Sequence, residues 1–302
     1  MGMQINTNVS ALNAYRNLSS TQNDLSKSLE KLSSGLRINR AADDAAGLAI
    51  SEGLRSQVNG LNVAARNAQD GISVIQTAEG ALTEVHSILQ RMRDLAVQGG
   101  NDSNNVESRA AIQNEANQLG AELSRISEST NFNGINLFQA GGDPAATPAV
   151  PAGPATLSFQ VGSDGNAASQ ISVKMLDLST ALSDGTTDLV TLGAGTLATD
   201  ASGFDVTDAA AAAKTITLID AAITNVSTGR AELGAAQNRF ESTINSLNVS
   251  SENLAAAESR IRDTDMAAEM VKYTAANILS QAGTAMLAQA NQSNQGVLQL
   301  LR

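Results

Sequence analysis

The chain has 302 residues, a formal net charge of −11, 2% aromatic residues and no cysteine or tryptophan. The lack of cysteine excludes a disulfide scaffold and any thiolate metal site, and the acidic balance argues against nucleic acid, because phosphate binding needs clustered Lys and Arg. No run of 18 apolar residues is present, and the first residues lack the pattern of a secretory signal. We therefore expect either a cytosolic protein or export by a route without such a signal. Scarce aromatic residues leave burial to many small aliphatic contacts, which favours thin helical bundles.

A first helical pattern covers residues 5–36. Its leucines recur at spacings compatible with a heptad, and the positions between them are rich in Ser, Asn, Gln and Lys. Gly35 breaks the pattern, and residues 36–42 are expected to connect it to the next helix. Because a helix with this surface has little to hold it in isolation, we expect it to be ordered only when a partner covers its apolar stripe.

The longest helical pattern runs from Asp43 to Gln98 without a proline. Its larger apolar residues step by four and three from Leu54 to Ala96, with one extra step of three that indicates a stammer in a coiled coil. Either Asp43 or Asp44 can cap the start of this helix. A helix of this length would extend about 75–80 Å, so its stripe must be buried against other long helices.

A shorter return helix is expected after the long one. Residues 99–105 are rich in Gly and Asn and predict a turn. Apolar residues then step by four and three from Ile112 to Ile126, which predicts a helix antiparallel to the long one. It is expected to end near Asn133-Gly134, a pair of residues that tolerate positive φ.

The middle of the chain changes character. Four prolines within residues 144–154 mark a linker. Two alternating runs, residues 157–161 and 171–175, flank Asp164-Gly165 and predict a β-hairpin that leans on the helices. Residues 179–208 are rich in Gly, Thr and Asp and are expected to form loops with short strands.

From Ala209 the helical signal returns. Six apolar residues, each seven positions after the last, form the strongest periodic signal of the sequence and pair naturally with the long helix. They are Val226, Leu233, Phe240, Leu247, Leu254 and Ile261. Residues 266–302 continue as an apolar segment rich in Ala and Gln, which would promote aggregation of a soluble monomer if it were exposed. We therefore expect this surface to be buried between subunits.

Together these patterns predict a mainly α protein. Its architecture is expected to be a long antiparallel coiled-coil or helical-bundle rod built from both chain ends, with a small β-hairpin region in the middle. The expected core of the rod consists of heptad residues from the two long patterns. They are Leu54, Leu61, Ile72, Leu82, Leu89, Val226, Leu233, Phe240, Leu247 and Leu254.

The sequence offers no constellation for catalysis, a cofactor or a metal. His86 is the only histidine, and no second ligand lies at a usable spacing from it. Asp263 and Asp265 are too few for a calcium loop, so a helix junction or a solvated turn is favoured over cation binding. We expect no enzyme, no catalytic residue, no bound metal and no cofactor.

Several blocks of the sequence together resemble the bacterial flagellins. The N-terminal blocks are MQINTN at residues 3–8, LSSGLRIN at 32–39, ADDAAG at 42–47 and QRMRDLAVQ at 90–98. The C-terminal blocks are SRIRDTD at residues 259–265 and the tail through Arg302. The resemblance covers residues 1–140 and 210–302, and the middle matches only in having a hairpin.

This resemblance implies a division of the chain. Residues 1–42 with 262–302 would form an inner terminal coiled coil, and residues 43–140 with 209–261 an outer helical rod. Residues 141–208 would form a Pro/Gly-rich linker and hairpin region of the rod, too short for the large outer domains of many flagellins. Terminal helices of that family are disordered in the monomer and fold on assembly.

The resemblance also implies a function. The chain is expected to be a structural subunit that self-assembles into the bacterial flagellar filament for swimming motility and is exported from the cell. Its partners would be copies of itself, an export chaperone, the filament cap and the hook-junction proteins, with neither nucleic acid nor membrane among them. A hook–filament junction protein shares these terminal patterns and is the alternative.

Two sets of residues carry a further implication of the resemblance. Arg91, Leu95 and Glu115 match the flagellin positions recognised by the vertebrate Toll-like receptor for flagellin. Without the resemblance, these residues would indicate a solvated Arg–Glu pair beside an edge leucine. The second set matches the terminal leucines engaged by cytosolic flagellin sensors, and its first role would be packing in the filament core. It comprises Leu298, Leu300 and Leu301.

Overall fold

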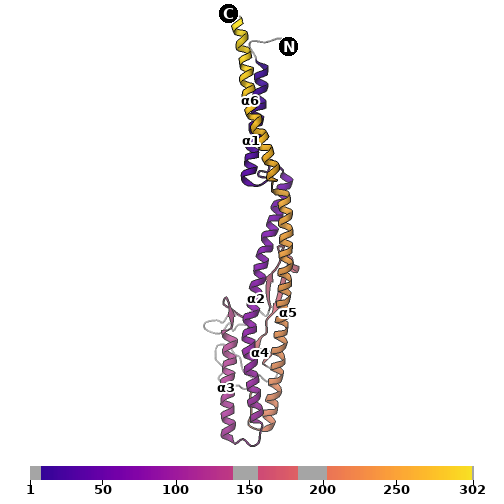
Figure 1. Cartoon of the computed structure of the whole chain (residues 1–302). Coiled ribbons are helices and arrows are strands. Elements are labelled where there is room, and N and C mark those ends of the chain that lie inside the picture. The colour runs from indigo at the N-terminus through magenta and orange to yellow at the C-terminus, as the bar shows by residue number, and fades with distance from the viewer. Residues whose placement is uncertain (1–7, 139–155, 183–202, 301–302) are drawn as a thin grey trace, which may run out of the picture. The chain divides into compact units, whose positions relative to one another are not determined.

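The structure is a computed structural model that describes residues 8–138, 156–182 and 203–300, and of residues 293–300 the backbone alone. It is mainly α, as predicted, with two short antiparallel strand pairs (Figure 1). The helices are α1 (Val9–Ser34), α2 (Ala45–Gly99), α3 (Val106–Ser129), α4 (Leu178–Ala181), α5 (Ala209–Arg262) and α6 (Met266–Leu300). The strands are β1 (Asn131–Phe132), β2 (Ile135–Asn136), β3 (Thr156–Gln160) and β4 (Gln170–Lys174).

The chain forms two compact units. The terminal unit comprises Met1–Asn59 and Ser251–Arg302, and the central unit comprises Gly60–Ser250. The long helices α2 and α5 each contribute residues to both units. The finer division into an inner coiled coil and an outer rod, with boundaries at residues 42 and 262, stays a prediction.

In the terminal unit, α1 and α6 lie side by side and run antiparallel (Figure 1). Near the start of α1, Asn8 donates a hydrogen bond from Nδ2 to the carbonyl oxygen of Ala290 at 2.9 Å. Beyond the other end of α1, the backbone N–H of Arg37 donates to the carbonyl oxygen of Arg262 at 2.6 Å. Gly35 ends α1 at a φ of 72°, a left-handed conformation that favours glycine, as the break in the pattern predicted.

The start of α2 uses one of the two candidate capping residues. Oδ1 of Asp44 accepts a hydrogen bond from the backbone N–H of Gly47 at 2.8 Å, so Asp44 is the cap. Asp43 instead accepts from the backbone N–H groups of Arg40 and Asn39, at 3.0 and 3.2 Å. These two bonds lower the pKa of the Asp43 carboxyl below its ordinary value, because they favour the charged form.

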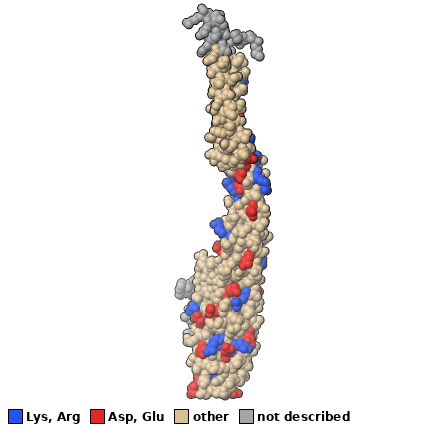
Figure 2. Space-filling view, in the orientation of Figure 1, with Lys and Arg blue, Asp and Glu red and all other residues tan. Residues whose placement is uncertain are grey.

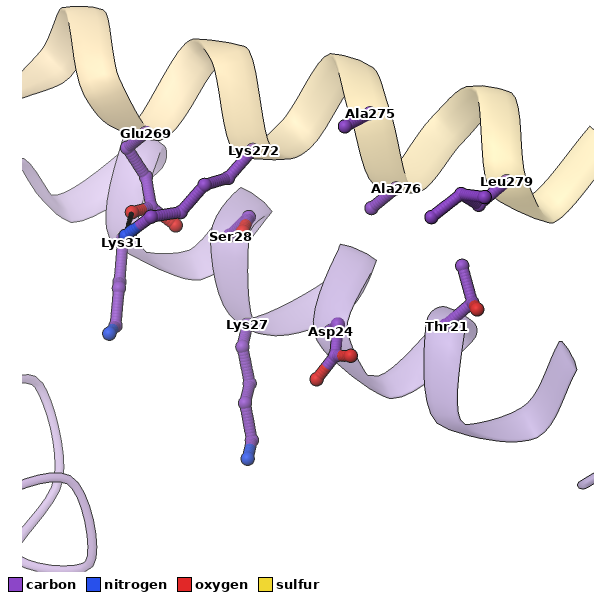
Figure 3. Close-up of a pocket in the computed structure, with 10 residues that line it drawn as sticks. All are labelled: Thr21, Asp24, Lys27, Ser28, Lys31, Glu269, Lys272, Ala275, Ala276 and Leu279. Carbon is purple, nitrogen blue, oxygen red and sulfur yellow. Dashed lines mark hydrogen bonds and ion pairs between the residues drawn. The ribbon is translucent and has the colours of Figure 1, made fainter. Parts of the chain in front are cut away.

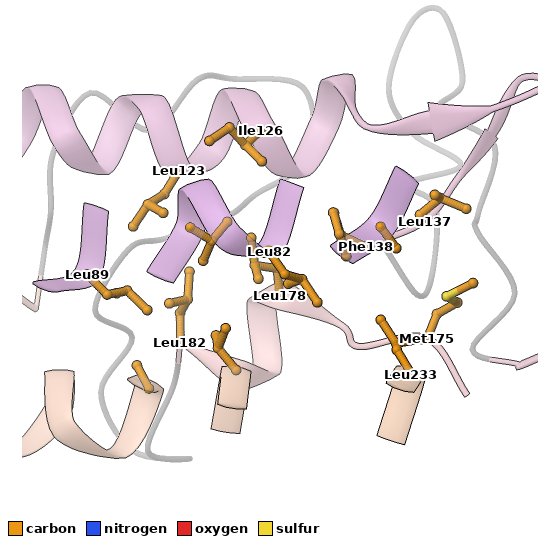
Figure 4. Packing of buried hydrophobic residues seen from close by; sticks show 14 of the residues in the cluster. Leu82, Leu89, Leu123, Ile126, Leu137, Phe138, Met175, Leu178, Leu182 and Leu233 are labelled. Carbon is orange, nitrogen blue, oxygen red and sulfur yellow. The ribbon is translucent and has the colours of Figure 1, made fainter. Parts of the chain in front are cut away.

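In the central unit, α2, α3 and α5 surround one hydrophobic core, to which β3, β4 and α4 add side chains (Figure 4). Two ion pairs join neighbouring helices at the surface of this core. Arg91 on α2 meets Glu115 on α3 at 2.6 Å, and Arg93 on α2 meets Asp220 on α5 at 2.7 Å. Both α3 and α5 therefore contact the C-terminal part of α2.

The expected core positions fall into two groups. The buried group comprises Leu61, Leu82, Leu89, Val226, Leu233, Phe240 and Leu247. The half-buried group comprises Leu54, Ile72 and Leu254. Helix α2 also buries residues beside its main stripe, such as Ala64 and Val74, because other elements cover it on more than one side.

The predicted β-hairpin is present as the antiparallel pair β3 and β4. Asp164-Gly165 lies in a connection of residues 161–169 that includes a 3₁₀ helix at Ala167–Ser169, so it does not form a tight two-residue turn. The ring of Phe159 on β3 meets that of Phe240 on α5 edge to face, with centroids 5.5 Å apart. The hairpin thus leans on a long helix, as expected.

Two short elements near the hairpin complete the central unit. The predicted turn at Asn133-Gly134 is present, with φ of 51° and 79°, and it joins β1 to β2. Helix α4 replaces the start of the loop expected over residues 179–208, and the backbone N–H of Leu178 donates to the carbonyl oxygen of Phe138 at 3.1 Å. The linker at 144–154 and residues 183–202 lie outside the described residues.

Candidate functional site

The terminal unit buries very little apolar surface. Among its described side chains, the buried hydrophobic ones are Ile38 and Ala276. The central unit, in contrast, holds the whole of the main hydrophobic cluster. Because the stability of a small unit depends on buried apolar area, α1 and α6 have little to hold them together within one subunit.

The apolar side chains of α1 and α6 point outward instead. Ten of the sixteen exposed large hydrophobic side chains in the described part of the chain lie on these two helices, each at least 47% exposed. On α1 they are Val9, Leu12, Tyr15 and Leu29, and on α6 they are Met266, Met270, Val271, Ile278, Leu279 and Met286. A surface of this kind marks a site of association with another protein.

Charge is scarce on α6, whereas α1 carries Arg16, Asp24, Lys27, Glu30 and Lys31. Residues 273–300 contain no Asp, Glu, Lys or Arg. In Figure 2 the surface of α1 and α6 is tan over most of its length, whereas charged groups of both signs cover α2, α3 and α5. The uncharged part of α6 suits contacts with copies of itself, since no like charges would meet there.

The residues expected at the receptor site lie in the central unit and not on the apolar surface of α1 and α6. Arg91 donates from Nε and Nη2 to Oε1 of Glu115, at 2.9 and 2.6 Å, and both side chains are about half exposed, at 56% and 45%. Leu95 lies one turn after Arg91 but is only 2% exposed, so it belongs to the core and is not an edge leucine. The structure therefore brings the Arg–Glu pair to the surface and buries Leu95 in the hydrophobic core.

The terminal leucines are only partly covered by the structure. Leu298 and Leu300 lie in the last turns of α6, where the backbone alone is described. Leu301 lies outside the described residues.

The candidate catalytic and metal-binding residues have structural partners. His86 is half-buried on α2, with Nε2 2.9 Å from Nε2 of Gln90. Oδ1 of Asp265 accepts from the backbone N–H groups of Ala267 and Ala268 at the start of α6, and Asp263 accepts from the hydroxyl of Ser259 at 2.6 Å. The two aspartates thus serve a helix junction, the interpretation that the sequence favoured.

No group of three or more His, Cys, Asp or Glu side chains among the described residues is arranged to hold a metal ion. No described helix combines the length and the apolar character needed to cross a bilayer.

Glu269, on the first turns of α6, was not among the site residues predicted from the sequence. This carboxylate is 5% exposed, pairs with Lys272 at 3.2 Å, and lines a cavity between α1 and α6 together with Ser28 (Figure 3). The hydroxyl of Ser28 first, and then Lys272 and the charge of Lys31, hold the pKa of Glu269 below its ordinary value of 4.5 despite its burial. Nothing in the local pattern marked this glutamate, because only the pairing of two distant helices buries it.

Comparison with known families covers most of the chain. Residues 5–142 match the bacterial flagellin N-terminal helical region, and residues 216–301 match the bacterial flagellin C-terminal helical region. Relatives match along the full length: a flagellin of Halalkalibacterium halodurans is 50% identical, covering 99% of this chain and 100% of that protein. A flagellin of Bacillus subtilis (strain 168) is 51% identical, with the same coverage of 99% and 100%.

Among solved structures, a candidate flagellar hook-associated protein from Vibrio parahaemolyticus has a TM-score of 0.58, covering 73% of this chain and 100% of that chain. Its sequence identity is 15%, so it shows the fold alone and does not favour the hook–filament junction alternative. The full-length relatives and the two matched regions point the other way. The chain belongs to the bacterial flagellins, the non-enzymatic structural subunits that self-assemble into the extracellular flagellar filament.

Proposed function

We propose that the terminal unit makes the principal contacts between subunits in the filament, and that α1 and α6 become fully ordered as subunits polymerise. The observation that carries this proposal is the contrast within α1 and α6 between many exposed apolar side chains and very few buried ones. Residues 1–42 with 262–302 would then form the inner coiled coil, and residues 43–140 with 209–261 the outer rod, with residues 141–208 as its linker and hairpin region.

The free energies of burial and association favour contacts with several neighbours over a simple dimer. Full burial of one large aliphatic side chain contributes about 1.5–3 kcal/mol, so covering four or five contributes on the order of 10 kcal/mol. Association itself costs about 4–15 kcal/mol in lost freedom of motion. With one partner, the free energy gained by burial is therefore about equal to the cost of association. A subunit surrounded by neighbours buries the exposed apolar side chains of both helices, so the gain exceeds the cost.

Truncation of the C-terminus tests this assignment. Deletion of residues 298–302 removes Leu298, Leu300 and Leu301, and we expect it to abolish seeded polymerisation, measured by sedimentation and electron microscopy, while the helical circular dichroism of the central unit is retained. A point variant with these three leucines changed to Ala should behave in the same way. The matched control changes the interspersed Gln295 and Gln299 to Ala and should polymerise. Polymerisation of the truncated chain at the normal rate would refute the assignment.

The exposed terminal helices would also be the surface used by an export chaperone, the filament cap and the hook-junction proteins. Support for these partners comes from the resemblance to flagellins and from the apolar surface of α1 and α6, which must be covered before assembly.

We further propose that the vertebrate flagellin receptor recognises Arg91 and Glu115. The pair is exposed and preorganised by two hydrogen bonds, and Arg is a frequent energetic centre of protein interfaces. In this proposal Leu95 supports the helix surface from below and does not itself touch the receptor. Leu298, Leu300 and Leu301 would be the contact for cytosolic sensors once a subunit is free of the filament.

Receptor activation by single variants tests the proposal for Arg91. Arg91→Ala is expected to lower the potency of the purified protein in a receptor reporter assay by about tenfold or more, because loss of a central interface Arg costs over 1 kcal/mol. The matched control is Arg125→Ala, since Arg125 forms a similarly exposed pair with Glu122 at 2.5 Å on α3. Equal potency of the two variants would count against the assignment.

A further inference from the structure

The described methionine side chains divide by exposure according to the compact unit in which they lie. In the core of the central unit Met92 is fully buried, and Met175 is 5% exposed (Figure 4). The other three described methionines lie on α6 in the terminal unit: Met266, Met270 and Met286 are 47%, 51% and 66% exposed. Within the described residues, exposed thioether groups therefore occur on α6 alone.

The pairing of α6 with α1 leaves these three side chains uncovered. The residues of α6 that line the cavity between the two helices are others, namely Glu269, Lys272, Ala275, Ala276 and Leu279 (Figure 3). Met266 and Met270 are four positions apart and so share one face of α6, and Met286 lies about 24 Å beyond Met270 along the helix. The three thioethers thus extend along most of the described length of α6.

An exposed thioether is open to oxidation by hydrogen peroxide. A lone pair of the methionine sulfur attacks one peroxide oxygen, so that a sulfur–oxygen bond forms and the oxygen–oxygen bond breaks. The leaving hydroxide takes up the proton of the transferred oxygen and departs as water, so the sulfur loses two electrons and the peroxide gains them. The product, methionine sulfoxide, is polar, whereas the thioether is apolar.

No other sulfur of the chain competes for the oxidant, because the chain has no cysteine. The reaction is also reversible. Methionine sulfoxide reductases return the sulfoxide to the thioether, with two thiols of a reductant oxidised to a disulfide and the oxygen released as water.

We infer that Met266, Met270 and Met286 form a reversible oxidation site that controls polymerisation of this flagellin, an inference that rests on the proposed role of α1 and α6 in contacts between subunits. Oxidation of a free subunit places polar oxygens on the apolar surface that neighbouring subunits would cover. A covered sulfoxide oxygen needs a hydrogen-bond donor, because an unpaired buried polar group is costly. Lys and Arg, the donors that make charge-assisted bonds, are absent from residues 273–300.

The site acts before assembly and not after it. In a filament held together by α1 and α6, the same side chains are covered by neighbouring subunits, so peroxide reaches their sulfur atoms slowly. Free subunits that meet the oxidant are thereby kept from polymerising, while subunits already in the filament are protected.

Peptide mapping by mass spectrometry measures the rate of oxidation at each methionine in free subunits and in filaments under the same hydrogen peroxide. In free subunits we expect the three methionines of α6 to be oxidised about tenfold faster or more than Met92 and Met175, since a core position must open before peroxide reaches it. In filaments the rates on α6 should be about tenfold lower, because the neighbouring subunits must first separate.

Seeded polymerisation is then measured after the peroxide has been removed with catalase. Oxidation of the unchanged chain is expected to raise the concentration of free subunits at equilibrium about tenfold or more, because each unpaired buried polar group is costly. Methionine sulfoxide reductases with dithiothreitol should restore the original value.

A triple variant, Met266→Leu with Met270→Leu and Met286→Leu, separates the effect of α6 from that of the other methionines. Leucine keeps the size and apolar character of methionine but cannot be oxidised in this way. The variant is expected to polymerise equally before and after peroxide. It keeps Met1 and Met3, which lie outside the described residues, so an effect of their oxidation would still be seen. Met175→Leu, which removes a buried sulfur, is the matched control and should be inhibited as strongly as the unchanged chain.

Three outcomes would overturn the inference. Normal polymerisation of subunits that carry sulfoxide at all three positions would show that α6 tolerates the polar groups. Equal inhibition of the triple variant and the unchanged chain would place the effect at other residues. Equal rates of oxidation on α6 in filaments and in free subunits would contradict the proposed function and the inference together, whereas the first two outcomes, with protection in the filament retained, leave the proposed function intact.

Discussion

At the scale of single residues, Gly71 of α2 packs closely against Phe240 of α5. Phe240 is fully buried on α5 and also meets Phe159 of the hairpin. A Cβ at position 71 would lie 2.9 Å from the Cζ of Phe240, so the ring fits here because residue 71 has no side chain. The heptad pattern predicted the ring but gave no reason to single out the glycine, because the absence of a side chain leaves no periodic signal.

Substitution of this glycine gives a prediction with a built-in control. Gly71→Ala is expected to lower the free energy of unfolding by about 1–3 kcal/mol, because the methyl group overpacks the ring of Phe240. Gly80 lies in the same helix with nothing within 4 Å of an added Cβ. Gly80→Ala is therefore expected to raise the free energy of unfolding by about 0.5–1 kcal/mol through helix propensity alone.

Urea unfolding followed by helical circular dichroism measures both variants against the unchanged chain. The direction of the two shifts is the test: opposite signs support the close packing of Gly71 on Phe240. A stabilising effect of both substitutions would mean that the ring has room to move and that the contact is loose.

At the scale of elements, the long helices were predictable and the short ones were not. A helical pattern of more than fifty residues without proline specifies α2 to within two residues at either end, since many weak signals add up along it. Helix α4 has only four residues, Leu178–Ala181, and its first backbone N–H is held by Phe138, forty residues earlier. Tertiary contacts of this kind are invisible to a local pattern.

Some residues of the candidate sites were likewise predictable from the sequence, and others were not. Arg91 and Glu115 could be paired from the sequence, because an antiparallel return helix brings position 115 back alongside position 91. The burial of Leu95 could not be predicted, because its spacing from Arg91 does not show how much of the surface of α2 is covered by α3 and α5. Glu269 was missed for a related reason: its burial depends on α1, which lies more than 200 residues earlier in the sequence.

At the scale of the whole molecule, the two compact units are stabilised by different interactions. The central unit rests on its hydrophobic cluster, whose strength changes little with pH. The terminal unit has almost no buried apolar side chains, so the interactions of one buried carboxylate form a larger share of its stability. Acid should therefore act first on the terminal unit, and with it on the filament that this unit is proposed to hold together.

The sign of the acid effect follows from the lowered pKa of Glu269. A carboxyl whose pKa is lower in the folded state stabilises that state fully above its ordinary pKa of 4.5, and the contribution is lost as the pH falls through the folded value. Protonation removes the attraction of Lys272 and of the more distant Lys31, while Lys27 and Asp24 on α1 are the other charged residues that line the same cavity. The pairing of α1 with α6 is thus expected to weaken below about pH 4.5.

The measurement is the concentration of free subunits in equilibrium with filaments, from pH 6 to pH 3.5. Glu269→Gln lacks this titration, so at pH 6 its free concentration is expected to exceed that of the unchanged chain, and the two values should converge as the pH falls. Other carboxylates with lowered pKa, such as Glu122 beside Arg125, are the same in both proteins and cancel in the comparison. Glu252→Gln, at an exposed position of the terminal unit, should follow the unchanged chain throughout. A constant ratio between Glu269→Gln and the unchanged chain would mean that the charge of Glu269 contributes nothing to assembly.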